Sequence, residues 1–186
     1  MIDGDTFKIK EGSGDRRVRL IGVNAPEIGK CLSIEAKTKL TELVSGRAVT
    51  LKDQFSDPFG RIMANVFVGD KYINREMLSN GLGRMDYYEN PHREELKKAY
   101  ESARLAKKGL YSGVCISSKP PLSGITNLPC NIKGNIDENL QKKIYFLLTC
   151  GNYSQVTIDL STDEQWFCTE GEAMSAGFTK SPTCDR

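Results

Sequence analysis

The chain has 186 residues, with 26 Lys and Arg against 24 Asp and Glu and a formal net charge of +2. A hydrophobic fraction of 39% with 27% charged residues is typical of a globular protein. This composition excludes a disordered polyelectrolyte, and no stretch approaches the roughly 18 apolar residues that a membrane-spanning helix needs. The length suits one large or two small domains.

Seven elements are expected in the first part of the chain, in alternating strand and helix groups. The strands are expected at 5–10, 16–23, 47–53 and 61–68, and the helices at 33–45, 73–80 and 92–107. Gly-rich or Pro-containing turns separate the strands of each pair, and Gly46, Gly81 and Gly109 follow the three helices. Few strands with a helix between them fit a small closed barrel of the oligonucleotide-binding type.

Charge and cysteine content divide the chain into two parts. Residues 1–112 hold 20 basic and 16 acidic side chains and only Cys31, whereas residues 113–186 hold 6 basic and 8 acidic side chains and five cysteines. Such a shift indicates two units with different roles. We predict a first domain at 1–112, a linker at 113–129 rich in Ser, Pro and Gly, and a small α+β accessory domain at 130–186.

The second part combines short apolar strands with scattered cysteines. Thr169 and Glu172 have the spacing of a capping box and predict a short helix at 170–176. No Cys-x-x-Cys pair occurs, so a zinc knuckle is disfavoured. Disulfides are favoured, with free thiols and a metal site as the alternatives. Disulfides imply an oxidising compartment, and the expected location is extracellular or periplasmic.

Six charged residues in the first part are not explained by hydrophobic periodicity. They are Asp3, Asp5, Arg17, Arg19, Glu27 and Arg61. Each alone has an ordinary explanation, since Asp-Gly is a turn dipeptide and alternating Arg side chains often form a solvated strand face. Together they carry carboxylates, which suit a hard cation such as calcium, and guanidinium groups, which suit a phosphate. The set therefore indicates phosphodiester hydrolysis.

Four ordered motifs lie in the same part. They are Ile2–Thr6, Val18–Glu27, Asp57–Val66 and Ile73–Leu82. Over about residues 1–112 they resemble the staphylococcal nuclease (thermonuclease) family. The resemblance implies a five-stranded OB-fold barrel with three helices, and calcium-dependent endonuclease cleavage of DNA and RNA with little sequence preference.

The resemblance also implies roles for individual residues. Asp5, Asn24 and the Ala25 carbonyl would bind Ca²⁺, and Glu27 would orient or deprotonate water. Arg19 and Arg61 would stabilise the phosphoryl transition state, and Phe59 and Tyr87 would bind the nucleotide.

Two departures from the family pattern shape the alternatives. Asn24 stands where the family has Asp, so one ligand charge is missing and calcium affinity should fall. The alternative function is therefore a catalytically weak or inactive OB-fold module that binds nucleic acid or a protein partner. The chain also enters its first strand without a lead-in, which leads us to expect a truncated N-terminal strand. A monomer is expected, and the ligand of the C-terminal domain is unknown.

Overall fold

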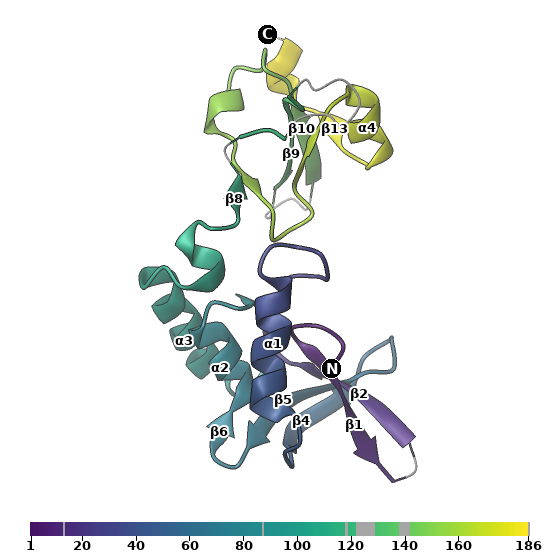
Figure 1. The fold of residues 1–186 in the computed structure, drawn as a ribbon, viewed down its shortest axis with the longest axis vertical. Coiled ribbons are helices and arrows are strands. Elements are labelled where there is room, and N and C mark those ends of the chain that lie inside the picture. The colour runs from purple at the N-terminus through teal and green to yellow at the C-terminus, as the bar shows by residue number, and fades with distance from the viewer. Residues whose placement is uncertain (13, 87, 118, 122–128, 138–141, 186) are drawn as a thin grey trace. The chain divides into compact units, whose positions relative to one another are not determined.

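A computed structural model describes the chain except residues 13, 87, 118, 122–128, 138–141 and 186, and it divides into two compact units (Figure 1). Unit 1 is Met1–Val114 and unit 2 is Cys115–Arg186. Residues 122–128 of the expected linker lie outside the described residues. Earlier in that stretch, strand β8 (Ile116–Ser117) pairs with β11 (Ile158–Asp159) in unit 2.

Unit 1 contains seven described strands and three α-helices. The strands are β1 (Thr6–Glu11), β2 (Gly14–Leu20), β3 (Val23–Asn24), β4 (Thr50–Ser56), β5 (Ile62–Val68), β6 (Lys71–Tyr72) and β7 (Arg84–Met85). The helices are α1 (Ser33–Val44), α2 (Ile73–Ser79) and α3 (Arg93–Leu105), followed by the 3-10 helix η1 (Gly109–Ser112). All three α-helices lie within the ranges expected from the sequence, because the apolar period and the glycine stops both act locally.

The main sheet of unit 1 is open among the described residues. Its order is β1-β2-β5-β4, with β6 also paired to β5, and only the β2–β5 pair is parallel. The closed five-stranded barrel expected from the sequence is therefore corrected to a mixed α/β unit with a five-stranded open sheet. Closure requires hydrogen bonds between the first and last strands, and β1 and β4 do not pair.

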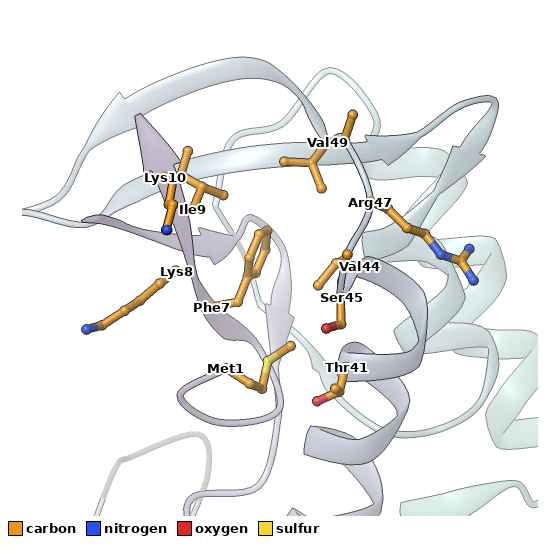
Figure 2. Close-up of a pocket in the computed structure, with 12 residues that line it drawn as sticks. Met1, Phe7, Lys8, Ile9, Lys10, Thr41, Val44, Ser45, Arg47 and Val49 are labelled. Atoms are coloured by element: carbon orange, nitrogen blue, oxygen red, sulfur yellow. The ribbon is translucent and has the colours of Figure 1, made fainter. Parts of the chain in front are cut away.

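A cavity of about 720 Å³ borders β1, the end of α1 and the segment that leads into β4. Figure 2 shows Phe7 of β1 and Val44 of α1 beside this cavity, whereas the charged ends of Lys8 and Arg47 point away from it. The space beside β1 is thus bounded by a helix end and a loop in place of a partner strand.

The core of unit 1 lies between the sheet and the helices. Leu20 of β2, Leu40 of α1 and Met77 of α2 are all fully buried in it. A buried amide fixes α2 on the sheet: Asn74 donates to the carbonyls of Ile21 (2.9 Å) and Ala64 (3.1 Å). These bonds satisfy backbone groups that burial would otherwise leave unpaired.

The described residues of unit 2 form a four-stranded sheet, the two-stranded β8–β11 sheet and one α-helix. The further elements of this unit are β9 (Ile132–Asp137), β10 (Lys142–Phe146), η2 (Tyr153–Gln155), β12 (Gln165–Phe167), α4 (Glu170–Ser175), β13 (Thr179–Lys180) and η3 (Pro182–Asp185). The order of the four-stranded sheet is β12-β9-β10-β13. The capping box is confirmed: the Thr169 hydroxyl accepts from the backbone N–H of Glu172 at the start of α4.

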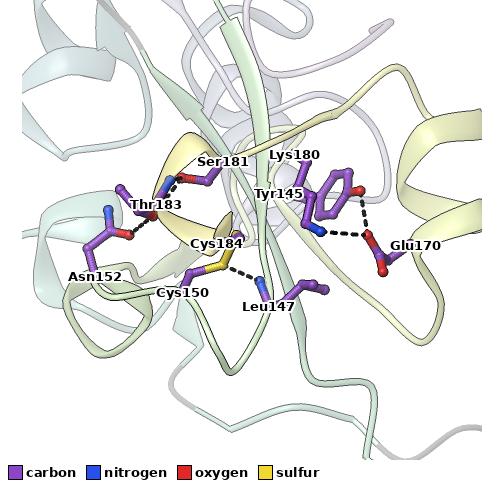
Figure 3. Close-up of a disulfide and its surroundings, with 9 residues drawn as sticks. All are labelled: Tyr145, Leu147, Cys150, Asn152, Glu170, Lys180, Ser181, Thr183 and Cys184. Carbon is purple, nitrogen blue, oxygen red and sulfur yellow. Dashed lines mark hydrogen bonds and ion pairs between the residues drawn. A yellow bond between two sulfur atoms is a disulfide. The ribbon is translucent and has the colours of Figure 1, made fainter. Parts of the chain in front are cut away.

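The prediction of disulfides is confirmed. Cys130 is bonded to Cys168 and Cys150 to Cys184, and no cysteine is free. Figure 3 shows the Cys150–Cys184 bridge, where the Leu147 N–H donates to Cys150 Sγ.

None of the helices in the described part of the chain is long and apolar enough to cross a membrane.

Candidate active site

Asp5 is the buried anchor of the candidate site. It lies directly before β1, and only 2% of its surface is exposed. Its Oδ1 accepts from the Thr6 hydroxyl (2.8 Å) and from Arg19 Nη1 (2.5 Å), and its Oδ2 accepts from the backbone N–H of Ala25 (2.9 Å). One carboxylate therefore connects the start of β1, the end of β2 and the loop after β3.

Arg19 extends this cluster to Asn24. Its Nη2 donates to Asn24 Oδ1 at 3.0 Å, while Nη1 holds Asp5. Asn24 is fixed by its strand, because β3 pairs with β7 and Asn24 lies opposite Arg84. The structure thus brings together Asp5, Arg19, Asn24 and Ala25, four of the residues predicted from the sequence.

Arg61 is held by a separate set of contacts in the β4–β5 turn. Its Nε donates to Asp57 Oδ2 (2.7 Å), while Asp57 Oδ1 accepts from the backbone N–H groups of Phe59 and Arg61 (both 2.9 Å). The Phe59 ring is 72% exposed and lies 5.2 Å from the Arg61 guanidinium carbon. Arg17 donates to the Phe59 carbonyl, which ties the turn to β2.

Asp57 fixes the Arg61 side chain and is not among the site residues expected from the sequence. Partial burial acts to raise its pKa, but hydrogen bonds from Arg61 and the positive charge of Arg61 outweigh this, so the pKa lies below its ordinary value. The turn sequence Asp57-Pro-Phe-Gly could have predicted this role, because an Asp at the first position of a turn accepts hydrogen bonds from backbone N–H groups.

Sheet register sets where the two arginines lie. In the parallel β2–β5 pair, Arg19 lies opposite Met63, and Arg61 precedes Met63 by two residues. Arg19 lies near the end of β2, and Arg61 is the last residue of the β4–β5 turn, directly before β5. The pairing of β2 with β5 therefore brings the two arginines onto neighbouring segments of the chain, and guanidinium groups are suited to bind phosphate.

Glu27 and Tyr87 are the two remaining site residues expected from the sequence. Glu27 is exposed in the turn after β3. Within the described part of the chain, no hydrogen bond or ion pair joins its carboxylate to Arg19 or Arg61. Tyr87 lies outside the described residues.

The environment of Asp5 perturbs its acidity. Burial, the largest cause, raises its pKa from 3.8 to about 6, with a further rise from the negative charge of Asp3, although the guanidinium of Arg19 opposes both. In the metal-free protein, the ionised form of Asp5 therefore costs stability that the protonated form does not.

This shift predicts an unusual pH dependence of stability. Because the folded pKa is above the unfolded value, the contribution of Asp5 is most favourable below pH about 4 and is lost as the pH rises through about 6. In chelator, the free energy of unfolding of the wild type relative to Asp5→Asn should fall by up to about 3 kcal/mol between pH 4 and 7. Urea unfolding of both proteins measures this.

Asp15→Asn is the control for this experiment, because Asp15 is an exposed carboxylate on the same hairpin. Its difference from the wild type should change little over the same pH range. A rise in wild-type stability relative to Asp5→Asn with increasing pH would show instead that the charge of Arg19 dominates the acidity of Asp5.

The donor chemistry of the cluster fits a hard cation. Asp5 supplies a carboxylate and Asn24 an amide oxygen, which are ligand types that calcium binds. Among the described residues, no three His, Cys, Asp or Glu side chains are grouped to hold a metal ion. The site therefore offers oxygen ligands with a single negative charge, and Arg19 balances that charge.

Comparison with known proteins identifies a family for unit 1. The family model described as staphylococcal nuclease homologue matches residues 17–113, just over half of the chain. The chain belongs to this family. The matched residues include the second half of β2, the β4–β5 turn and all three α-helices of unit 1.

Curated relatives carry nuclease names at low identity. A thermonuclease of Staphylococcus intermedius is 36% identical over 100 residues, covering 47% of this chain and 57% of the relative. A micrococcal nuclease of Shigella flexneri is 27% identical over 122 residues, covering 60% and 70%. A probable staphylococcal-like nuclease of Oryza sativa subsp. japonica is 29% identical over 117 residues, covering 60% and 32%. The chain spans 28 to 57% of the length of the first three relatives that it matches.

Proposed function

We propose that unit 1 is a calcium-dependent endonuclease that hydrolyses phosphodiester bonds in DNA or RNA with little sequence specificity. The observation that carries this proposal is the cluster of Asp5, Arg19 and Asn24, with Arg61 in the turn that leads into β5, the strand paired with β2. A module that only binds nucleic acid has no need for a buried carboxylate bonded to an arginine, because exposed basic side chains suffice for phosphate attraction.

Each residue has a role in the proposed reaction. Arg19 and Arg61 hold the phosphate and stabilise the negative charge that grows on its oxygens. Glu27 orients a water molecule and accepts its proton. The water oxygen then forms a bond to phosphorus while the ester P–O bond breaks, and the leaving oxygen takes a proton from solvent water. Asp5, Asn24 and the Ala25 carbonyl would hold Ca²⁺, which when bound polarises the phosphoryl oxygen.

Several wider assignments belong to the same proposal. Unit 1 is the nuclease domain on an OB-fold plan, and unit 2 is an accessory domain with a ligand of its own. Phe59 and Tyr87 contact the nucleotide. The disulfides support an extracellular or periplasmic location, since such bonds persist in oxidising compartments.

The second candidate is a module that binds nucleic acid without cleaving it. The observation that favours it is the state of the cluster: both Asp5 oxygens already accept protein hydrogen bonds, and the second predicted ligand is a neutral amide. In that case Arg19 neutralises Asp5 and the cluster stabilises the fold.

Asn24→Asp tests the proposal and separates the two candidates. The variant restores a second ligand charge, and ligand charge count tunes calcium affinity. We expect the calcium concentration for half-maximal cleavage of single-stranded DNA to fall by about tenfold or more, because one charge-assisted ligand is worth about 1.5 kcal/mol or more. Calorimetric calcium titration of the same proteins provides a readout that does not depend on cleavage.

Gln155→Glu is the charge-matched control, since Gln155 is exposed in unit 2. It should leave the calcium requirement unchanged. An unchanged requirement in Asn24→Asp would remove Asn24 from the metal site. Retardation of DNA with no cleavage by either protein at any calcium concentration would establish the binding module.

A further inference from the structure

Two exposed aromatic rings contact each other outside the cluster described above. Phe55 of β4 is 43% exposed and Tyr88 is 47% exposed, and their ring centroids lie 6.3 Å apart at 46°. Single exposed apolar residues are normal on a protein surface. Two large rings that contact each other and stay about half exposed form an apolar patch, which indicates a binding surface.

A β-bulge determines the direction of Phe55. In the antiparallel β4–β5 pair, Lys52 lies opposite Asn65 while Phe55 lies opposite Met63, so three steps along β4 match two steps along β5. The extra residue lies between Lys52 and Phe55, where Asp53 has a positive φ of 51°. A regular ladder would have placed Phe55 opposite Ile62, whose side chain belongs to the other face. Bulges re-aim side chains in this way.

The bulge places Phe55 on the same sheet face as Arg19. Arg19, Met63 and Phe55 form one row across β2, β5 and β4. Neighbouring strands lie about 4.8 Å apart, so the Cα atoms of Arg19 and Phe55 are about 10 Å apart. Phe55 therefore lies on the sheet face of Arg19, and Tyr88 contacts Phe55.

A buried hydrogen-bond network fixes both halves of the aromatic pair. Asn65 is fully buried, and its Nδ2 donates to Asp53 in the bulge (2.8 Å) and to Asn90 (2.9 Å). Asn90 donates back to Asn65 Oδ1 (3.0 Å), and the Tyr72 hydroxyl donates to the same oxygen (2.6 Å). Asp53 precedes Phe55 by two residues, and Asn90 follows Tyr88 by two residues. The Asn65 side chain therefore anchors the backbone segments of both rings.

We infer that Phe55 and Tyr88 form a stacking platform for an unpaired nucleobase next to the phosphate held by Arg19 and Arg61. The inference rests on the proposed function for the position of that phosphate. The ligand is single-stranded nucleic acid, because a base paired and stacked in a duplex has no free face to offer. The arginines supply the complementary charge for its backbone, and the rings accept any base because every base has a π-face.

Substitution of the rings tests the platform. Phe55→Ala and Tyr88→Ala should each raise KM for a short oligothymidylate by about 5-fold or more, the range found for base–aromatic stacking. The preference for oligothymidylate over an abasic oligonucleotide of equal length should fall toward one in both variants. Tyr88→Phe should keep this preference, since stacking needs the ring and not the hydroxyl. Leu105→Ala is the control, because Leu105 is 86% exposed and is the last residue of α3.

Binding of a fluorescent oligothymidylate separates this inference from the proposed function. If the wild type cleaves DNA but Phe55→Ala keeps its KM and base preference, the platform is overturned while the nuclease stands. If the wild type cleaves nothing but binds oligothymidylate more tightly than the abasic chain, and Phe55→Ala loses that difference, the platform stands without the nuclease. Equal loss of binding to both chains would also overturn it, since that result marks a general effect on the fold.

Discussion

A Glu27→Gln variant is expected to lose cleavage by about 10²- to 10⁴-fold in kcat, the range that a positioned general base contributes. Glutamine keeps the size and polarity of the side chain but cannot accept a proton from water. Since Glu27 is exposed, the substitution should leave the free energy of unfolding within about 0.5 kcal/mol of the wild-type value. Steady-state cleavage of single-stranded DNA at saturating calcium measures the loss.

Glu101→Gln is the matched control, because Glu101 is an exposed glutamate on α3 and the charge change is identical. It should retain wild-type kcat. Retarded migration of an oligonucleotide by Glu27→Gln would show that the inactive variant still binds its substrate. If Glu27→Gln cleaved as fast as the control, the general-base role would be wrong, and another group would have to accept the proton.

The parts of the candidate site that the sequence predicted are those with a local signal. Asp5 follows an Asp-Gly turn, and Arg19 and Asn24 lie within one continuous motif that ends a strand. Their contacts were not predictable from spacing, because the ladder between β1 and β2 brings Asp5 beside Leu20. The order of the motifs indicated which residues form the candidate site. The hydrogen bonds among Asp5, Arg19 and Asn24 are visible only in the structure.

The contact between Phe55 and Tyr88 could not be predicted from the sequence pattern. The predicted strand ended at residue 53, whereas β4 continues to Ser56 after the bulge. The bulge depends on the positive φ of Asp53 and on its hydrogen bond to Asn65, which is a neighbour only after β4 and β5 pair. Period-2 alternation cannot reveal such a register change.

The prediction of a closed barrel was wrong for a related reason. The count and order of strands are the same for an open and a closed sheet, and only pairing between the outermost strands decides between them. In the described residues, β1 and β4 each have one paired neighbour in the main sheet. Helix positions were predictable because capping and apolar period are local, as Thr169 and Glu172 of α4 illustrate.

Removing the Cys130–Cys168 disulfide is expected to destabilise unit 2 by about 2–5 kcal/mol. The bridge joins residues 38 apart in sequence and lies where β9 and β12 pair, next to the register match of Ile132 with Phe167. Cys168 also directly precedes Thr169, which caps α4. The bridge therefore holds both a strand pair and the start of a helix.

The small core of unit 2 explains why the loss should be large. Its main buried apolar cluster consists of five residues: Ile132, Tyr145, Phe167, Ala173 and Phe178. A cluster of this size supplies little stability without covalent links. Replacing both cysteines with serine avoids a free thiol, and we expect unit 2 to unfold first on heating or in urea.

The chain carries its own reporter for this experiment. Trp166 is the only tryptophan and lies on β12 of unit 2, where its Nε1 donates to Ser117. Its fluorescence should show unfolding at a lower urea concentration in the double variant, whereas Ser154→Ala, an exposed control in η2, should match the wild type. An unshifted Trp166 transition would show that packing alone holds unit 2.

Cleavage activity reports on unit 1 in the same samples. The buried apolar clusters of the two units share no residue, so the calcium-dependent cleavage proposed for unit 1 should persist after Trp166 reports that unit 2 has unfolded. Loss of both signals at one urea concentration would mean that the two units unfold cooperatively. In that case the stability of unit 1 would depend on the disulfides of unit 2.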